Sequence, residues 1–204
     1  MKHLQNGKVI FQINRNHYSK LHLTPHFFVY LKNGQIRIHH REKSSNSISS
    51  TFSTISVPFR SSFCQNFSPY ISDLSVDNGV SLAYVTNFQD KVEVKVYDVK
   101  IKQETVNIVL DKHTGNDYEF DCYMESPLIR IYKNKLLCTT GGTVAYLFDD
   151  IFSKQKPKVF HNEGDIIRIF MEDDSIGFVM EDTNSTIRFI HYDLTTNERF
   201  SFYI

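Results

Sequence analysis

Alanine and tryptophan are almost missing from this 204-residue sequence, which contains two alanines, Ala83 and Ala145, and no tryptophan. Alanine has the strongest intrinsic helix propensity, and no window of about 12 residues carries a helical apolar stripe with capping signals at its ends. Phenylalanine (17) and tyrosine (11) are frequent instead, alongside many Val, Ile and Thr residues, and these residue types favour strands. The sequence therefore predicts an all-β protein.

Cysteine is also scarce, with three residues, Cys64, Cys122 and Cys138, at wide spacings. An odd number at such spacings matches neither a disulfide framework nor a C-x-x-C metal site. We expect buried free thiols in a reducing compartment. No apolar segment approaches the roughly 18 residues of a membrane span, and the first 20 residues lack a signal-peptide core. The expected location is therefore cytoplasmic or nuclear, without membrane association.

The sequence has no excess of charge of either sign, because 23 Lys and Arg residues balance 23 Asp and Glu residues. A balanced chain offers no global positive field for phosphate backbones, so no nucleic-acid partner is predicted. Hydrophobic residues make up 41% and charged residues 23% of the chain, as in ordinary globular proteins. We expect residues 1–204 to fold as a single domain.

Histidine is common, with nine residues, but the patterns do not predict a metal site. His22 and His26 do not form a helical pair, because Pro25 and the surrounding strand pattern exclude a helix there. His39 and His40 point to opposite faces of one strand, so at most one of them could join a given site.

Motifs for catalysis are missing as well. The acidic pairs Asp173-Asp174 and Glu181-Asp182 do not match a calcium loop and are interpreted as solvated turns. Gly141-Gly142 lacks the lysine and helix of a phosphate loop and is interpreted as a hairpin turn. Neither a Gly-x-Ser-x-Gly elbow nor a cysteine-nucleophile signature occurs. We predict no catalytic residue, metal or cofactor.

Hairpins are the clearest local pattern. In residues 26–40 two apolar runs flank Lys32-Asn33-Gly34, and Asn-Gly supplies the positive φ angles of a tight turn. In residues 91–96 valines alternate with Lys and Glu, which predicts a half-exposed strand. The serine-rich segment 43–62 is interpreted as a mobile loop in its first third, with a strand allowed later.

An aromatic residue followed by a polar one ends a strand at four places. The pairs are His40-Arg41, Tyr97-Asp98, Phe148-Asp149 and Tyr192-Asp193, and their second members are 57, 51 and 44 residues apart. Two strands precede the strand that ends in each pair, and one strand follows it. This order predicts four four-stranded antiparallel units, at about residues 19–60, 70–111, 126–161 and 164–204. The period is that of propeller blades. A sandwich or irregular barrel of about 16 strands is the alternative, but it gives no reason for a repeated strand order.

Over residues 19–204 the chain resembles a degenerate WD-repeat-like β-propeller. Tyr97-Asp98, Phe148-Asp149 and Tyr192-Asp193 stand where that family has its Trp-Asp pair. The sequence departs from the family in having no Gly-His dipeptide at the start of a unit and His40-Arg41 in the first unit. The resemblance implies that the aspartates join a hydrogen-bond network, whose usual histidine is missing here.

The two ends of the sequence both look like strands. Residues 199–204 are expected to form the outermost strand of the fourth unit. Residues 8–14 are expected to form an extra strand, which looks like the outer strand of a blade whose other strands are absent. We therefore expect an incomplete or open array, either the carboxy-terminal part of a larger propeller or one closed by self-association or by a partner.

The function that this organisation favours is a non-enzymatic protein–protein interaction module or scaffold, with loops on a rigid base as the recognition surface. The loops between second and third strands would share one rim, and Phe88 is the first candidate anchor, unless its ring folds back over its own hairpin. The predicted partner-binding residues are Asn33, Asn87, Phe88, Asp90, Gly141, Gly142, Asp182 and Asn184. Two alternatives are the substrate-receptor part of an F-box-type ubiquitin ligase, although no F-box occurs in the sequence, and a propeller hydrolase or lyase with a channel site.

Overall fold

The computed structural model describes residues 2–5, 8–12, 20–24, 27–32, 35–41, 48–56, 69–77, 80–112, 126–153 and 155–203. All regular elements in these ranges are strands, arranged as four four-stranded sheets and one two-stranded sheet. No helix in the described ranges is long and apolar enough to cross a membrane. The predicted all-β fold of four-stranded antiparallel sheets is confirmed.

Each four-stranded sheet is an antiparallel meander in chain order, and we call the sheets blades 1 to 4. Blade 1 contains β3 (Lys20–Leu23), β4 (Phe27–Lys32), β5 (Gln35–Arg41) and β6 (Ile48–Ser56). Blade 2 contains β7 (Tyr70–Asp77), β8 (Ser81–Asn87), β9 (Lys91–Asp98) and β10 (Gln103–Asp111). Blade 3 contains β11 (Ile129–Tyr132), β12 (Lys135–Thr139), β13 (Val144–Phe148) and β14 (Lys158–His161). Blade 4 contains β15 (Asp165–Met171), β16 (Ser175–Glu181), β17 (Ile187–Asp193) and β18 (Arg199–Tyr203).

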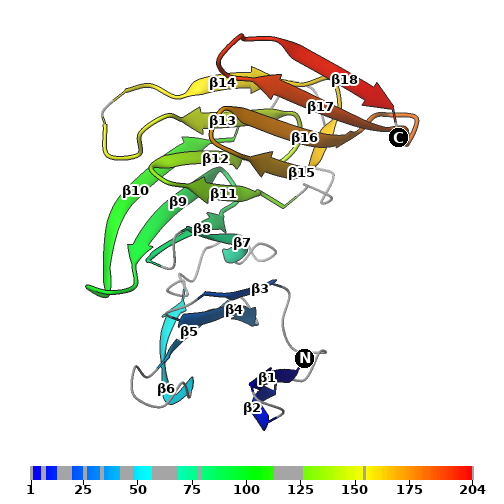
Figure 1. Ribbon diagram of the computed structural model, residues 1–204. Helices are drawn as coiled ribbons and strands as arrows, with labels where there is room; N and C mark the ends of the chain where they lie inside the picture. Colours follow the sequence, from blue (N-terminus) through cyan, green and yellow to red (C-terminus); the bar gives the residue numbers. More distant parts are fainter. Residues whose placement is uncertain are drawn as a thin grey trace.

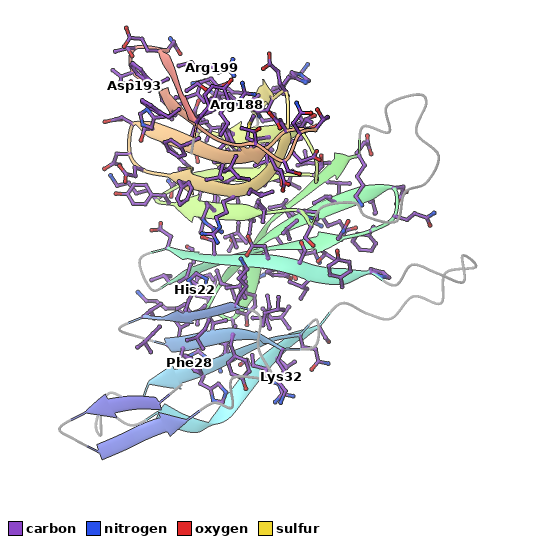
Figure 2. The ribbon with its side chains drawn as sticks, turned by 90° about the vertical axis from the view of Figure 1, so that its right-hand side faces the viewer. His22, Phe28, Lys32, Arg188, Asp193 and Arg199 are labelled. Carbon is purple, nitrogen blue, oxygen red and sulfur yellow. The ribbon has the colours of Figure 1, made fainter. Side chains whose placement is uncertain are left out.

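The blades stack face to face in chain order, with the first strands of neighbouring blades in contact along one inner edge (Figure 1). Blade 1 and blade 4 lie at opposite ends of the stack. Figure 2 shows the same order from the side, with Phe28 at one end and Arg188 and Arg199 at the other. The described strands thus form an open arc.

The hydrophobic core is divided into layers between the blades, because each inner sheet buries both faces in its neighbours. Blade 2 illustrates how period-two alternation produces this. Val92, Val94 and Val96 of β9 are buried against blade 3, whereas Leu82 and Tyr84 of β8 face blade 1. The third layer, between blades 3 and 4, contains Leu137, Leu147, Ile166, Ile169, Phe178 and Ile190.

The aspartates of the aromatic–polar pairs fix the turns into the fourth strands. Asp98 Oδ1 accepts the backbone N–H groups of Lys100 (2.8 Å) and Ile101 (3.1 Å). Asp193 Oδ1 accepts those of Thr195 (2.8 Å) and Thr196 (3.0 Å) in the same way. In both turns the aspartate accepts hydrogen bonds from its own loop, so turn formation explains why the pair occurs in blades 2 and 4.

In blade 3 the aspartate that accepts a hydrogen bond from the turn lies one residue later in the sequence. Asp150, and not Asp149 of the pair Phe148-Asp149, accepts a backbone N–H, that of Phe152, at 3.0 Å. Asp149 instead forms an ion pair with Lys158 across the start of β14 (3.1 Å).

The matching sequences 128–132 and 166–170 adopt different registers. In β11 the regular alternation buries Ile129 and Ile131. In β15 a bulge lies between Ile166 and Arg168, and the buried residues are Ile166 and Ile169. A bulge adds one unpaired residue and reverses the side-chain pattern beyond it.

Residues 8–14 were expected to form the outer strand of a blade, and this prediction was wrong about the pairing. Residues Lys8–Gln12 form β2, which pairs antiparallel with β1 (Lys2–Gln5) in a separate two-stranded sheet and not as the outer strand of a blade. In Figure 1 and Figure 2 this sheet lies at the blade 1 end of the stack. Residues 43–47 of the serine-rich segment, expected to form a loop, lie outside the described residues, and the later strand is β6.

Candidate functional site

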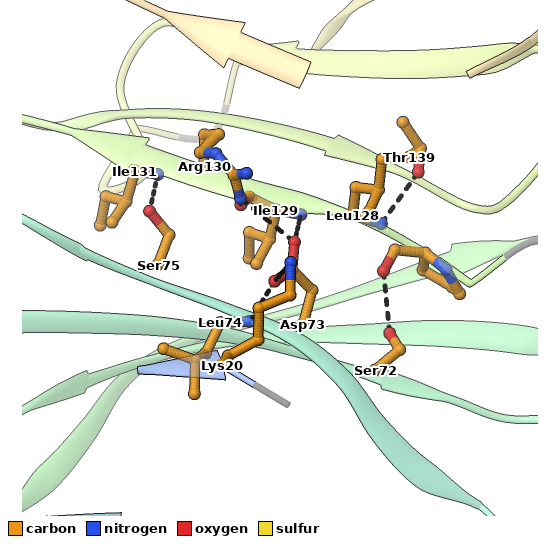
Figure 3. A network of polar contacts seen from close by, with 11 residues as sticks. Lys20, Ser72, Asp73, Leu74, Ser75, Leu128, Ile129, Arg130, Ile131 and Thr139 are labelled. Atoms are coloured by element: carbon orange, nitrogen blue, oxygen red, sulfur yellow. Dashed lines mark hydrogen bonds and ion pairs between the residues drawn. The ribbon is translucent and has the colours of Figure 1, made fainter. Parts of the chain in front are cut away.

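A polar network joins the inner edges of blades 1, 2 and 3, and Asp73 of β7 is its centre (Figure 3). The Asp73 side chain has no exposed surface (0%). Its Oδ2 accepts the backbone N–H of Ile129 (3.1 Å) and a guanidinium N–H of Arg130 (3.2 Å). Its Oδ1 accepts the N–H of Leu74 (2.8 Å) and lies 3.2 Å from Lys20 Nζ. One carboxylate thereby connects three blades.

Hydroxyl groups extend this network along β7. Ser75 Oγ accepts the backbone N–H of Ile131 at 3.1 Å, and Ser72 Oγ donates to the carbonyl of Pro127 at 2.9 Å (Figure 3). Neighbouring first strands belong to different sheets, so these side chains satisfy backbone groups that a ladder would otherwise pair. The network is chemically suited to holding blades together.

His22 of β3 lies beside this network. Burial lowers the pKa of the imidazole, and the nearby Arg130 guanidinium lowers it further, whereas the Asp73 carboxylate raises it. The neutral form is therefore favoured in the folded protein. The side chains of Lys20 and Arg130 are both committed to Asp73.

The remaining candidate groups for chemistry are the thiols and the potential metal ligands. Cys138 is a free, fully buried thiol, and burial raises its pKa. Within the described ranges no three His, Cys, Asp or Glu side chains gather as a metal site would require. Cys64 and Cys122 lie outside those ranges.

The first strands of neighbouring blades run in the same direction, and this places the loops. Asp73 lies beside Ile129 and Ser75 beside Ile131, while the ends of β11 and β15 meet through the ion pair of Lys133 with Asp173. The turns between second and third strands of blades 2 to 4 therefore lie at one rim. The connections from a fourth strand to the next first strand lie at the same rim.

Phe88, the first candidate anchor at the rim of blade 2, is held by its own hairpin. The Phe88 N–H donates to the carbonyl of Lys91 (2.9 Å), and Lys91 Nζ lies 5.1 Å from the centre of the Phe88 ring. The half-buried ring thus folds back on its own turn, while Asp90 is exposed. Lys112 Nζ donates to the Phe88 carbonyl at 2.6 Å, and burial lowers the pKa of this lysine.

Asn87 needs a correction, because its side chain is not part of the surface. It is 1% exposed, at the end of β8, and its Nδ2 donates to Tyr70 Oη at 3.1 Å. Asn33 lies outside the described residues. Gly141, Gly142, Asp182 and Asn184 lie at the rim of blades 3 and 4.

Between blades 3 and 4 the rim is hollowed. The hollow has a volume of about 260 Å³, and we call it the acidic rim hollow; its lining includes Thr143, Glu163, Gly164, Asp165, Glu181 and Asp182. Of its four carboxylates, Glu163 forms an ion pair with Arg188 (3.2 Å). No Lys or Arg of the described residues lies within ion-pair distance of the other three.

The walls of the acidic rim hollow are fixed by their backbone. Asp182 Oδ1 accepts the N–H groups of Asn184 and Thr186, each at 2.9 Å. The N–H of Ile166 donates to the carbonyl of Gly142 at 3.0 Å and so ties blade 4 to the turn of blade 3. At Gly164 a Cβ atom would lie 2.7 Å from the Glu181 carbonyl oxygen, so only glycine fits there.

Sequence analysis predicted part of the lining of this hollow and not the rest. Asp182 was predicted from a second-to-third turn, and the predicted Gly142 directly precedes the lining residue Thr143. Glu163 and Asp165 belong to the connection between β14 and β15, which meets the same rim only because consecutive first strands are parallel. The repeat units already contained this signal, since the direction of each strand follows from its place in the meander.

Neither a protein-family model nor a curated protein matches the chain. Among solved structures, the hydrazine synthase of Kuenenia stuttgartiensis is similar over 87% of this chain and 46% of its own, at 11% identity and a TM-score of 0.58. The WD40 domain of SCAP from fission yeast is similar over 95% of this chain and 53% of its own, at 10% identity and a TM-score of 0.53.

The Dos1 propeller is similar over 97% of this chain and 62% of its own, at 12% identity and a TM-score of 0.50. The chain thus spans less than two thirds of each of these three structures. At such identities the likeness concerns the fold alone. Together with the four meander sheets stacked along one inner edge, it identifies the chain as a β-propeller fold.

Proposed function

We propose that this chain is a non-enzymatic protein-interaction module, whose blades hold the acidic rim hollow as the docking site for a basic side chain of a protein partner. The observation that supports it is the set of three carboxylates, Asp165, Glu181 and Asp182, which line one concave surface and have no Lys or Arg of the described residues within ion-pair distance. Like charges around a concave surface focus negative potential and attract cations.

The chemistry of the hollow favours a guanidinium group. A carboxylate accepts two parallel N–H bonds from arginine, and this geometry gives orientation as well as attraction. The hollow already contains one carboxylate–guanidinium contact, in which both terminal nitrogens of Arg188 donate to a single Glu163 oxygen at 3.3 and 3.2 Å. The remaining carboxylates would accept a second guanidinium from the partner.

The rigidity of the rim adds to the proposal. The bonds of Asp182 to its own turn and the close contact at Gly164 fix the backbone before any partner arrives. Binding to a preformed surface avoids the entropy cost of ordering a loop. A basic segment would therefore bind without rearrangement of the blades.

Charge neutralisation tests this proposal. The variant Asp165→Asn, Glu181→Gln, Asp182→Asn removes three charges, and the amide introduced at position 182 keeps an oxygen that can accept the turn bonds. The control variant Asp149→Asn, Asp150→Asn, Asp174→Asn removes three charges at the opposite rim. Partners captured from source cells by the wild type and cross-linked in place should be retained by the control and lost by the rim variant. Wild-type capture should weaken as salt rises.

Equal capture by both variants would overturn the proposal. The two alternatives have their own outcomes. Ligase subunits among the captured proteins would favour a ubiquitin-ligase substrate receptor. Turnover without a captured partner, lost when inner-edge residues such as His22 are replaced, would favour an enzyme.

A further inference from the structure

Blade 4 ends the stack, and the register of its strands defines which side chains point away from blade 3. Directly paired residues lie on the same face of a sheet. Ile169, Phe178 and Ile190 are buried against blade 3. The residues next to them in each strand therefore form the opposite side, which we call the outer face of blade 4: Phe170, Gly177, Phe189, His191, Phe200 and Phe202.

The outer face of blade 4 carries exposed aromatic rings. Phe170 is 47%, Phe200 44% and Phe202 57% exposed. The rings contact their neighbours on the same face, since Phe170 lies 6.2 Å from Phe189, and His191 lies 6.2 Å from Phe200. An exposed apolar patch of this kind is typical of an interaction site.

A hollow opens on the same face, toward the turn between β15 and β16. It has a volume of about 380 Å³ and is lined by Phe170, Met171, Glu172, Ser175, Gly177, Phe189 and His191. A Cβ atom at Gly177 would lie 3.1 Å from the Phe189 ring, so the absent side chain is what lets Phe189 lie over this strand. Cavities of about 150 Å³ hold a benzene ring, so this hollow accommodates a phenylalanine side chain.

The face of blade 2 that corresponds to the outer face of blade 4 indicates which kind of surface would pack on blade 4. Both blades have the same bulge in their first strand, between Ile71 and Asp73 and between Ile166 and Arg168. The row Val85, Val94, Ile108 of blade 2 therefore corresponds to the row Val179, Phe189, Phe202 of blade 4. In blade 2 this face is covered by the sheet of blade 3. A second apolar sheet is accordingly the shape that fits blade 4.

The chain supplies one open sheet face of this kind among its described residues. At the other end of the stack, Phe28, Tyr30 and His39 share the outer face of blade 1, with ring centres 5.4 to 5.8 Å apart. These three side chains are only 2%, 8% and 9% exposed, so this face is already covered. Copies of the chain therefore do not join head to tail without uncovering blade 1.

We propose that the outer face of blade 4 is a homodimer interface, in which the same face of a second copy packs about a two-fold axis. The face is self-complementary, because it carries both exposed phenylalanine rings and a hollow that fits such a ring. In an isologous pair each copy inserts a ring into the Gly177 hollow of the other. Aromatic anchors in pockets dominate the energy of interfaces.

The size of the face sets the expected strength. Four strands of about seven residues cover roughly 400 Å² in projection, from the usual rise and strand spacing. A standard interface buries about 800 Å² per partner. The dimer is therefore expected to form in the micromolar range and to dissociate on dilution.

Sedimentation velocity of the full chain between about 1 and about 100 µM, the range around a micromolar dissociation constant, tests the inference. The wild type should move from monomer to dimer with concentration. The variant Phe200→Asp, Phe202→Asp should stay monomeric, at least tenfold weaker in self-association, because it places charges on the packed face. Both side chains lie on the exposed outer strand, so the fold should persist, as circular dichroism would verify. Gly177→Ala, whose Cβ would displace the Phe189 ring and so alter the hollow, should weaken the dimer as well.

The matched control is Ile101→Asp, Phe152→Asp, which places the same charges at side chains 62% and 61% exposed outside this face; it should dimerise like the wild type. A wild type that stays monomeric, or a dimer that survives Phe200→Asp, Phe202→Asp, overturns the inference. The triple rim variant that tests the proposed function should still dimerise, so the two proposals fail independently.

Discussion

The Asp73 carboxylate of β7 accepts the backbone N–H of Ile129 in β11 at 3.1 Å, and this bond joins the inner edges of two blades. No backbone ladder connects these blades, because they belong to separate sheets. Two basic side chains, each about one third exposed, lie on either side of the buried carboxylate and neutralise it. The open arc thus depends on a few side chains as well as on apolar layers.

Replacement of Asp73 by asparagine should destabilise the protein by about 3 kcal/mol, since it directs an amide toward groups that donate and removes the charge between Lys20 and Arg130. Urea unfolding measures this change. Asp90→Asn, at an exposed rim position, should change stability by less than about 0.5 kcal/mol. Equal stability of the two variants would show that the network adds nothing to blade packing.

The stability of the fold should fall as the solution becomes mildly acidic. Burial lowers the pKa of His22 from its ordinary value of 6.5. The pKa of His40 is lowered mainly by burial and, to a smaller extent, by the positive charge of Lys102. Between the lowered folded-state pKa and 6.5 the unfolded chain binds more protons, so stability present above pH 6.5 is lost as pH falls through this window. Urea unfolding from about pH 7.5 to about pH 5.5 should show the loss. His22→Gln should reduce it, and an unchanged slope would contradict the prediction.

The repeat of the fold was predictable from sequence because it has a local cause. The aspartates Asp98 and Asp193 close turns within their own loops, so in blades 2 and 4 the aromatic–polar pair marks the end of the third strand independently of the other blades. The alternation of Val92, Val94 and Val96 predicted the half-exposed strand in the same way.

Features that arise between blades were not predictable. In the sequence Asp73 is one polar residue within a predicted strand. Its partners Lys20 and Arg130 lie 53 residues before and 57 residues after it. The matching segments around Ile129 and Ile167 give no sign that only the second carries a bulge. Asn87 was predicted at the surface because Asn favours turns, but its strand ends one residue later than the pattern suggests.

Alanine at position 164 should be poorly tolerated. Its Cβ would lie 2.7 Å from the backbone oxygen and 3.2 Å from the backbone carbon of Glu181, and neither atom can rotate away as a side chain would. We expect Gly164→Ala to cost about 2 kcal/mol, in the range of overpacking, and to weaken partner capture at the acidic rim hollow. Thr183→Ala, an exposed change at the same rim, should cost less than about 0.5 kcal/mol. Full stability of Gly164→Ala would contradict the close packing of this connection.

The thiol of Cys138 should be inert in the folded protein. It is 0% exposed within the layer between blades 2 and 3, and burial raises its pKa, so little of the reactive thiolate forms at neutral pH. Alkylation followed by peptide mass spectrometry should leave the peptide containing Cys138 unmodified in native buffer and fully modified in urea. The rate of native-state labelling should rise in Asp73→Asn, because labelling requires opening of the blade 2–blade 3 layer and Asp73 ties those blades together. Rapid native labelling at Cys138 would contradict the burial of this layer. An unchanged labelling rate in Asp73→Asn would show that the polar network does not limit the opening of the layer.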